Sequence, residues 1–230
     1  MKIAVVTCTG KRPKMLPLCS RWVRSQTRQP DLWIISLGKD EDLGDTELPS
    51  YAKVHRWGAD LGKGMTGQID TNSKYQIEAI RQVPEGYAAC YFDDDDWYGP
   101  AYLETVERDF ASGRDISGNG SEKRYSLVLH KWMHIEKSGC NAGAVSMVPS
   151  VIPYWIKWMQ DPLTKFSWFI EQRFSVNLRN NAPRVSIKHG PGVGHLFPPA
   201  DYKWRSQPEK WSKLREWING DVRHYQELMS

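Results

Sequence analysis

The stretch "YFDDDDWYGP", residues 91–100, places four consecutive carboxylates, Asp93 to Asp96, between aromatic residues. At an effective dielectric constant of about 20, two unit charges roughly 4 Å apart repel by about 4 kcal/mol, so the cluster needs compensating positive charge. The run directly follows "GYAACYF", residues 86–92, whose apolar character is typical of a buried strand. The sequence therefore predicts a buried strand that leads straight into an acidic site.

The elements before and after this strand alternate between strands and helices. Strands are predicted at 2–8, 31–38, 53–57 and 86–92, and helices at 14–27, 71–84 and 99–112. Such alternation favours an α/β fold with a mostly parallel central sheet and helices on both faces. Ligands bind at the carboxyl ends of the strands in such sheets. We therefore expect the loop after the first strand to meet the Asp cluster, although about 80 residues separate them.

The second half of the chain is less regular. Its pattern predicts strands at 125–132 and 142–148, helices at 150–160, 167–180 and 208–219, and a Gly/Pro-rich loop at 188–204. We expect a single domain over residues 1–230, in which 1–112 and 113–230 are two halves of one compact fold.

The composition is that of an ordinary globular protein. The 230 residues carry a formal net charge of +4 with a pI near 8.8, which permits a phosphate-bearing ligand or nucleic acid but requires neither. The four cysteines, Cys8, Cys19, Cys90 and Cys140, form no CxxC pair, and we interpret them as reduced thiols. No segment approaches the ~18 apolar residues of a membrane span. A cytoplasmic location is expected, in the host cytoplasm if the protein is viral.

Two interpretations of the Asp cluster compete. Acidic runs are commonly solvated turns. This run, however, follows a buried strand and is flanked by Phe92 and Trp97, where unpaired carboxylates are poorly solvated. Hard oxygen ligands suit Mg²⁺ or Mn²⁺, which bind one or two carboxylates and complete their shell with water and substrate phosphates. The second interpretation, a divalent-metal site, is favoured.

At this point the chain resembles the nucleotide-sugar-dependent glycosyltransferases of the GT-A fold, especially the inverting "family two" type. The resemblance rests on four phrases in the right order: "TCTGKRP", "SQTRQPDLWIIS", "NSKYQIEAI" and "YFDDDDWYGPAYLETV". It covers roughly residues 1–110 well and the remainder loosely. It implies a nucleotide-sugar-binding half, 1–112, an acceptor-binding half, 113–230, and a UDP-sugar as the first choice of donor.

The resemblance also implies roles for individual residues. Asp93 and Asp95 match the two acids of the family's DxD motif, which hold the donor and a Mn²⁺ or Mg²⁺ ion, and Asp96 matches an additional acid at the donor. Asp94, the spacer of the motif, is expected to matter least. Further donor-binding positions are matched in the first loop and in the helix at 71–84: Thr7, Thr9, Arg12, Asn72 and Lys74.

Three parts of the expected site are less well matched. The family's base-reading Asp after the second strand has Asp40 as its nearest counterpart. The catalytic base that deprotonates the acceptor is expected at Glu171, with Asp161 in reserve. An ordinary surface acid paired with a neighbouring cation explains Glu171 equally well. His189 and His195 are candidates to complete the metal shell, and a hydrogen-bonded loop histidine is the alternative for each.

The acceptor is open at the level of sequence. Basic residues between 157 and 188 are interleaved with tryptophans, as in nucleic-acid surfaces, so the acceptor is a saccharide or, as in phage-type DNA-modifying enzymes, a hydroxymethylated pyrimidine in DNA. Two other functions stay open. "TGKRPK" is a thin version of the Gly-rich loop of nucleotidyltransferases that form sugar nucleotides, and a non-catalytic sugar- or nucleic-acid-binding module is the third.

Overall fold

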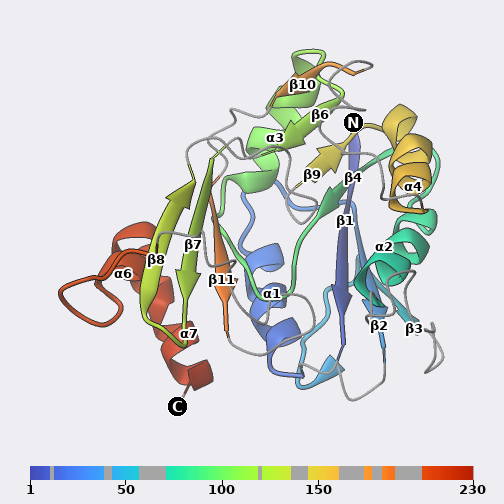
Figure 1. The fold of residues 1–230 in the computed structure, drawn as a ribbon. Helices are drawn as coiled ribbons and strands as arrows, with labels where there is room; N and C mark the ends of the chain where they lie inside the picture. The colour runs from blue at the N-terminus through green and yellow to red at the C-terminus, as the bar shows by residue number, and fades with distance from the viewer. Residues whose placement is uncertain are drawn as a thin grey trace.

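The structure is a computed structural model that describes residues 1–10, 13–38, 43–56, 71–118, 121–135, 145–160, 174–177, 183–189 and 204–229, without the side chains of 71–75 and 176–177. These residues form two sheets surrounded by helices (Figure 1). Residues 190–203 of the predicted loop at 188–204, and Cys140, lie outside the described residues.

The larger sheet has the order β10-β6-β9-β4-β1-β2-β3. Its strands are β1 (Lys2–Thr9), β2 (Leu32–Leu37), β3 (Ala52–Arg56), β4 (Tyr87–Tyr91), β6 (Ile116–Gly118), β9 (Val145–Met147) and β10 (Val176–Asn177). Four of the six neighbouring pairs are parallel, and β9 runs antiparallel to both β4 and β6. The two central strands, β1 and β2, are almost entirely buried, as expected for a sheet covered on both faces.

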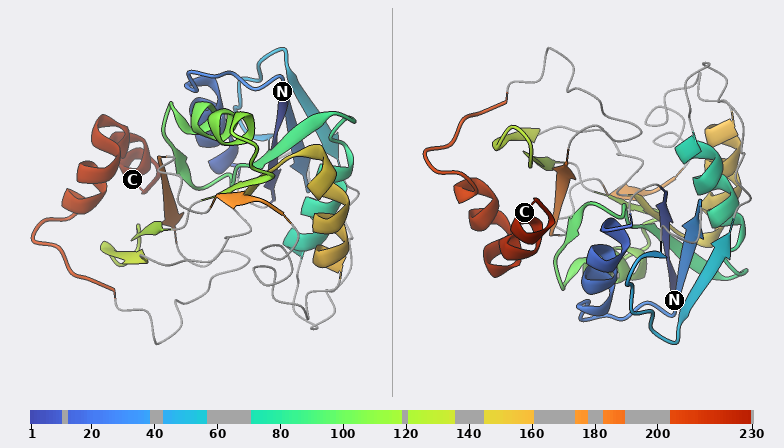
Figure 2. Two further views of the ribbon diagram at one scale, coloured as in Figure 1. Left: turned by 90° about the horizontal axis from the view of Figure 1, so that it is seen from above. Right: turned by 90° about the horizontal axis from the view of Figure 1, so that it is seen from below.

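Helices cover both faces of this sheet (Figures 1 and 2). They are α1 (Met15–Arg24), α2 (Thr71–Arg81), α3 (Tyr102–Ala111) and α4 (Ile152–Gln160), which follows the 3₁₀ turn η3 (Pro149–Val151). On one face, Cys19 Sγ of α1 lies 3.7 Å from Thr7 Oγ1 of β1. On the other, the Tyr91 hydroxyl donates to the Gln76 carbonyl of α2 and accepts from the Trp155 indole of α4, both at 3.2 Å. The predicted α/β fold with a mostly parallel sheet is confirmed.

A smaller sheet lies beside the first, in the order β5-β11-β7-β8. Its strands are β5 (Trp97–Tyr98), β7 (Glu122–Ser126), β8 (Lys131–Ile135) and β11 (Arg184–Lys188), and the C-terminal elements α6 (Ser212–Ile218), η4 (Asn219–Asp221) and α7 (Val222–Met229) follow. The two halves of the chain interlock, because β5 joins this sheet whereas β6, β9 and β10 complete the larger one.

Several predictions for the second half are wrong. Residues 125–132 are not one strand, because the chain turns between β7 and β8 with His130 at φ 49°. Val176 and Asn177 pair with β6 as a strand, although a helix is predicted there. Strand β11 and helix α7 were not predicted at all. Strands β10 and β11 pair with strands that are distant in sequence, and the local pattern does not register such partners.

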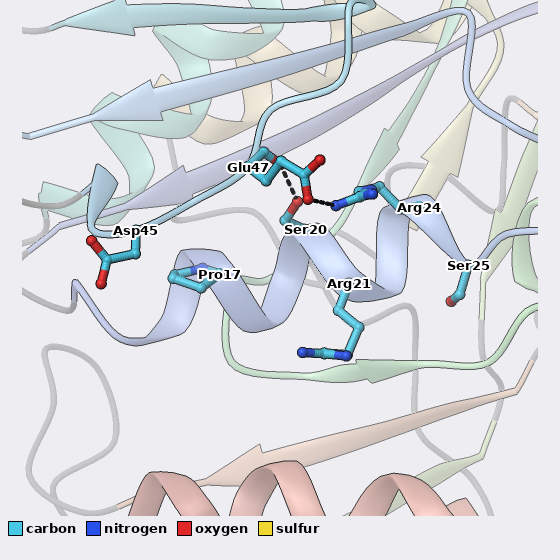
Figure 3. Close-up of a pocket in the computed structure, with 7 residues that line it drawn as sticks. All are labelled: Pro17, Ser20, Arg21, Arg24, Ser25, Asp45 and Glu47. Carbon is cyan, nitrogen blue, oxygen red and sulfur yellow. Dashed lines mark hydrogen bonds and ion pairs between the residues drawn. The ribbon is translucent and has the colours of Figure 1, made fainter.

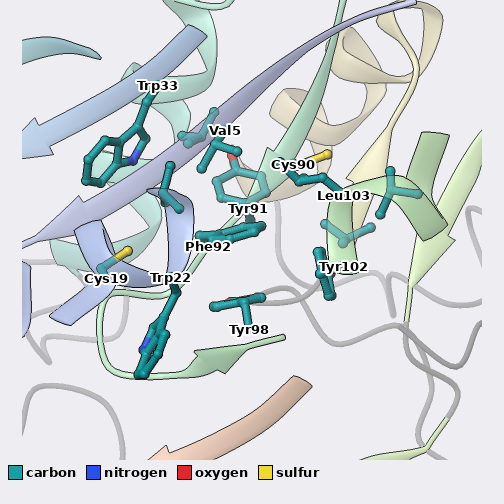
Figure 4. Close-up of a cluster of buried hydrophobic side chains, with 14 of the residues drawn as sticks. Val5, Cys19, Trp22, Trp33, Cys90, Tyr91, Phe92, Tyr98, Tyr102 and Leu103 are labelled. Carbon is teal, nitrogen blue, oxygen red and sulfur yellow. The ribbon is translucent and has the colours of Figure 1, made fainter. Parts of the chain in front are cut away.

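An aromatic cluster fixes the segment that joins the two sheets (Figure 4). The rings of Phe92 and Tyr98 stack with centroids 3.8 Å apart, and Tyr102 of α3 meets both edge-on at 5.3 and 5.1 Å. All three side chains are buried. The four aspartates are therefore held in a short turn between Phe92, at the end of β4, and β5.

The cysteines in the described part of the chain form no disulfide. Cys8, Cys19 and Cys90 are free, and burial raises the pKa of each thiol, that of Cys90 to about 12. These thiols are therefore protonated at neutral pH and are poor nucleophiles. No helix in the described part of the chain is long and apolar enough to span a membrane.

Candidate functional site

The Asp turn, residues 93–96, lies beside β1, the strand at which the order of the larger sheet reverses. Strands β2 and β3 extend from one side of β1, and β4 begins the other side, so β1 and β4 flank the switch point where open α/β sheets bind ligands. Thr9, the last residue of β1, donates its hydroxyl to Asp94 Oδ2 at 2.6 Å. The predicted meeting of the first loop and the Asp cluster is thereby confirmed.

The four carboxylates divide into two outward and two inward groups. The Asp93 and Asp95 side chains are 32% and 16% exposed. Asp94 and Asp96, in contrast, are 1% and 0% exposed. The turn thus presents alternate carboxylates to solvent. Asp94, the spacer that was expected to matter least, is buried and accepts the hydrogen bond that anchors the turn to β1.

A buried arginine supplies the positive charge that the cluster requires. The Arg184 side chain on β11 is 2% exposed, and its Nη2 pairs with Asp96 Oδ2 and lies 3.4 Å from Asp93 Oδ2. The other Asp96 oxygen accepts the backbone N–H of Ile187 at 2.7 Å. Asp96 is therefore fully engaged inside the protein, and the protein itself provides a counter-ion in addition to any metal.

The ionic network continues into the second sheet. Glu122 on β7 is 3% exposed and pairs with Arg124 Nη2 at 2.5 Å. Burial alone would raise the pKa of Glu122, but the hydrogen bond from Arg124 and the charge of Arg184 outweigh it and lower that pKa.

The pKa of Asp93 is shifted in the opposite direction. Burial, together with the charges of Asp96 and Asp95, outweighs the attraction of Arg184 and raises the pKa of Asp93 to about 8.

The outward carboxylate of Asp95 has a histidine partner. His189 follows β11, and its Nε2 lies 3.0 Å from Asp95 Oδ2. The structure thus brings together two residues that were both candidate metal ligands. The backbone of the turn is also held, since the Asp93 N–H donates to the Tyr98 hydroxyl at 2.8 Å.

The other predicted site residues fare differently. Thr7 is not placed to bind a donor, because it is fully buried and its Oγ1 accepts the Trp33 indole N–H at 3.0 Å. Asn72 and Lys74 lie in α2, but their side chains are not among those described. The remaining predicted residues lie outside the described part of the chain: Arg12, Asp40, Asp161, Glu171 and His195.

The "QT" phrase of the sequence proves to be structural. Gln26 Nε2 donates to the Gly99 carbonyl and its Oε1 accepts the Leu103 N–H, both at 3.0 Å. Thr27 N–H donates to the Pro100 carbonyl at 2.8 Å. The phrase therefore fixes the chain where it leaves the Asp turn and enters α3.

Sequence reasoning missed Arg184, which forms ion pairs with Asp96 and Asp93 of the cluster. "PRVSIK", residues 183–188, alternates small or polar with β-branched residues after a proline, which is the one local signal that could have predicted strand β11. Nothing local shows that its arginine faces aspartates about 90 residues away in the sequence.

The donor set of the turn fits a hard cation bound partly by substrate. In the described part of the chain, no three His, Cys, Asp or Glu side chains converge on a preformed metal site. Mg²⁺ and Mn²⁺ need only one or two carboxylates when phosphates and water complete the shell. Asp93 and Asp95, the two outward acids, provide that number.

The hollows along α1 are separate features. A pocket of about 550 Å³ is lined by α1 and the segment that precedes β3 (Figure 3). In this pocket Arg24 pairs with Glu47, and Ser20 donates to the Glu47 carbonyl. None of the four aspartates lines it. It consequently belongs to the surface of α1 and not to the Asp turn.

Comparisons with known proteins give structural neighbours only. No family model matches the chain, and no curated protein matches its sequence. Among solved structures, the chain is similar to S. aureus TarS 1-349, with 13% sequence identity and a TM-score of 0.43 over 67% of this chain and 49% of that one. It is also similar to S. aureus TarS, with 15% sequence identity and a TM-score of 0.34 over 55% of this chain and 21% of that one. For S. aureus TarS 1-349 in complex with UDP-GlcNAc, the sequence identity is 17% and the TM-score is 0.39, over 54% of this chain and 35% of that one. This chain spans half or less of each, and a likeness this weak supports no argument about function.

Proposed function

We propose that this chain is a GT-A-type glycosyltransferase that moves a sugar from a nucleoside-diphosphate sugar to a hydroxyl acceptor with the help of Mn²⁺ or Mg²⁺. The observation that supports this most is the division of the Asp turn at the β1/β4 switch point. Asp94 and Asp96 are buried and bonded to the protein, whereas Asp93 and Asp95 remain outward. A turn with only a structural role would not need two further carboxylates that repel each other.

Each residue of the turn then has a defined task. Asp93 and Asp95 would hold the cation, which when bound neutralises the diphosphate leaving group. Thr9 and Arg184 fix the turn from the two sheets. Arg184 Nε and Nη1 are buried and have no hydrogen-bond partner among the described residues.

The reaction also needs a base for the acceptor hydroxyl. Glu171 is proposed for this role, with Asp161 in reserve, because the family resemblance implies a carboxylate near the acceptor half. His189 is proposed to orient Asp95 or to join the metal shell, because its Nε2 already lies 3.0 Å from that carboxylate. Arg12 and Asp40 are proposed for the donor side, and His195 for the metal shell, on the resemblance alone.

The donor is proposed to be a UDP-sugar and the acceptor a saccharide or a hydroxymethylated pyrimidine in DNA. The choice of UDP follows from the family resemblance, and the DNA acceptor follows from the basic, tryptophan-rich second half. A cytoplasmic location is proposed with them, since no disulfide is present among the described cysteines.

Thermal-shift measurements test the donor and the metal together. A panel of nucleotide sugars, headed by UDP-sugars, is added to the chain with Mn²⁺ and with EDTA. The expected result is stabilisation by one donor only in the presence of Mn²⁺, and its loss in Asp95→Asn without a change in the melting temperature of the free protein. Metal-independent stabilisation, or an unchanged response in Asp95→Asn, would overturn the metal role.

Product analysis separates the alternatives. A glycosyltransferase releases a nucleoside diphosphate from the donor, whereas a nucleotidyltransferase consumes a nucleoside triphosphate and a sugar phosphate and releases pyrophosphate. A binding module releases neither. Formation of pyrophosphate, or of no product with any donor and acceptor, would replace the proposed activity with one of these alternatives.

A further inference from the structure

The face of the second sheet that packs against α6 carries a cluster of tryptophans and cations that the proposed reaction does not use. We define the β8–α6 patch by five residues: Trp132, Trp217, Lys123, Arg205 and Lys213. The rings of Trp132 and Trp217 meet edge-on with centroids 5.7 Å apart. Both tryptophans are half-buried, so part of each ring is accessible from solvent.

Three cations surround the two rings. Lys213 Nζ lies 4.7 Å from the Trp132 centroid and 5.5 Å from that of Trp217. Arg205 Cζ lies 5.0 Å from Trp132, and Lys123 Nζ lies 5.8 Å from Trp217. They come from three separate segments, β7, α6 and the stretch before α6, which are brought together by the fold.

The backbone holds this arrangement in place. The Trp132 N–H donates to the Arg205 carbonyl at 3.1 Å, and the Arg205 N–H donates to the Trp132 carbonyl at 2.8 Å. Residues around Arg205 thus pair with the outer edge of β8. The two tryptophans and their cations are consequently positioned by the sheet and helix and not by side-chain contacts alone.

The two segments that form the patch are both basic. Residues 121–135 carry three Lys or Arg against one Glu, and residues 204–217 carry four against two. The resulting net of +4 equals the formal net charge of the whole protein. Lys213 is partly neutralised by Glu216 at 2.6 Å, but Lys123 and Arg205 are exposed.

We infer that the β8–α6 patch binds single-stranded nucleic acid, with bases stacking on Trp132 and Trp217 and phosphates paired with Lys123, Arg205 and Lys213. Aromatic platforms bordered by cations bind unpaired bases with little sequence preference. A neutral saccharide would also stack on tryptophan, but it would gain nothing from three cations. An acidic peptide would satisfy the cations and leave the rings unused.

The test is fluorescence anisotropy of the full chain with a labelled single-stranded oligonucleotide in EDTA, without any nucleotide sugar. Three phosphate contacts predict a slope of about −2 in log K against log salt, and so about a 20-fold loss of affinity between about 50 and 200 mM salt. Lys123→Glu is expected to weaken binding and to reduce the slope by about 1. Lys53→Glu, which makes the same charge change on β3 at the opposite side of the molecule (Figure 1), is the matched control and should change neither.

A second pair of variants tests stacking. Trp217→Ala should weaken binding about tenfold, whereas Trp217→Phe, which keeps an aromatic face, should restore most of the affinity. Circular dichroism establishes that both variants are folded. Two outcomes would overturn the inference and leave at most a general polyanion surface. One is equal weakening of binding by Lys53→Glu and Lys123→Glu. The other is an unchanged affinity in Trp217→Ala together with complete displacement of the oligonucleotide by polyphosphate as competitor. Absence of salt-sensitive binding would also overturn it.

This inference stands apart from the proposed transfer reaction. Binding requires neither metal nor donor, so Asp95→Asn should bind the oligonucleotide with the affinity of the unmodified chain. Loss of binding in Asp95→Asn would show that the oligonucleotide enters the Asp turn, and it would contradict the assignment to the β8–α6 patch.

Discussion

Replacing Arg184 with methionine tests the central electrostatic feature of the fold. Arg184 is 2% exposed and Asp96 is 0% exposed, so among the described residues the substitution leaves a buried carboxylate with the Ile187 N–H as its hydrogen-bond partner. Breaking a buried ion pair from one side costs about 3–5 kcal/mol. We therefore expect Arg184→Met to lower the free energy of unfolding by about that amount, measured by urea denaturation at neutral pH.

The double variant Arg184→Met/Asp96→Asn separates charge from packing. The asparagine introduced by Asp96→Asn would keep an oxygen for the Ile187 N–H without the buried charge, so most of the lost stability should return. Arg81→Met is the control, because its ion pair with Glu78 is exposed and worth at most about 0.5 kcal/mol. A loss below about 1 kcal/mol in Arg184→Met, or a double variant no more stable than the single one, would refute the reasoning.

The pH dependence of Arg184→Met has a definite sign. Burial already raises the pKa of Asp96 despite the opposing charge of Arg184, and loss of the guanidinium would raise that pKa further above its value in the unfolded chain. A raised folded-state pKa makes the protonated form stable in the fold, so the destabilisation is largest at neutral pH and shrinks as the pH falls toward about 4. A stability difference that stays constant over this range would indicate that Arg184 acts through packing and not through charge.

The remaining predictions concern the frame of the turn. Thr9→Val removes the donor to buried Asp94 and should cost about 1–3 kcal/mol in urea denaturation, whereas a cost near zero would mean that water replaces the hydroxyl. Gly99→Ala would place a Cβ 2.7 Å from Pro183 Cβ, so a loss of about 1–3 kcal/mol is expected, and a neutral effect would contradict the tight contact between the segments. The pKa of Asp93 is raised to about 8, so its contribution to stability is fully present below about pH 4 and is lost as the pH rises toward 8. Asp93→Asn should flatten this decline in stability between about pH 5 and 8. An unchanged decline in the variant would assign it to another titrating group.

The first half of the fold was predictable because its signals are local. Buried strands such as β1 and β4 are continuous apolar runs, and α1 and α3 bury the residues that recur at helical spacing. Once the alternation of strands and helices is recognised, the position of the Asp cluster at the carboxyl edge of the sheet follows. The hydrogen bond between Thr9 and Asp94 confirms that the end of β1 and the Asp cluster meet at this edge.

The second half was less predictable because long-range pairing decides it. Strand β11 is only five residues long and pairs with β5 and β7, which lie about 60–90 residues earlier in the sequence. Its arginine supplies the counter-charge that the sequence analysis attributed to a metal ion alone. Thr7 illustrates the reverse error, since a polar residue near the end of a strand can equally serve a buried indole N–H.

The most direct test of the account is the position of a manganese ion. Crystals of the protein soaked with Mn²⁺ and a UDP-sugar, or with UDP, would be measured at the manganese absorption edge. We predict an anomalous peak in contact with Asp95, with Asp93 and the diphosphate close by and Arg184 still paired with Asp96. A bound nucleotide without manganese at this turn, or manganese bound at another place, would contradict it.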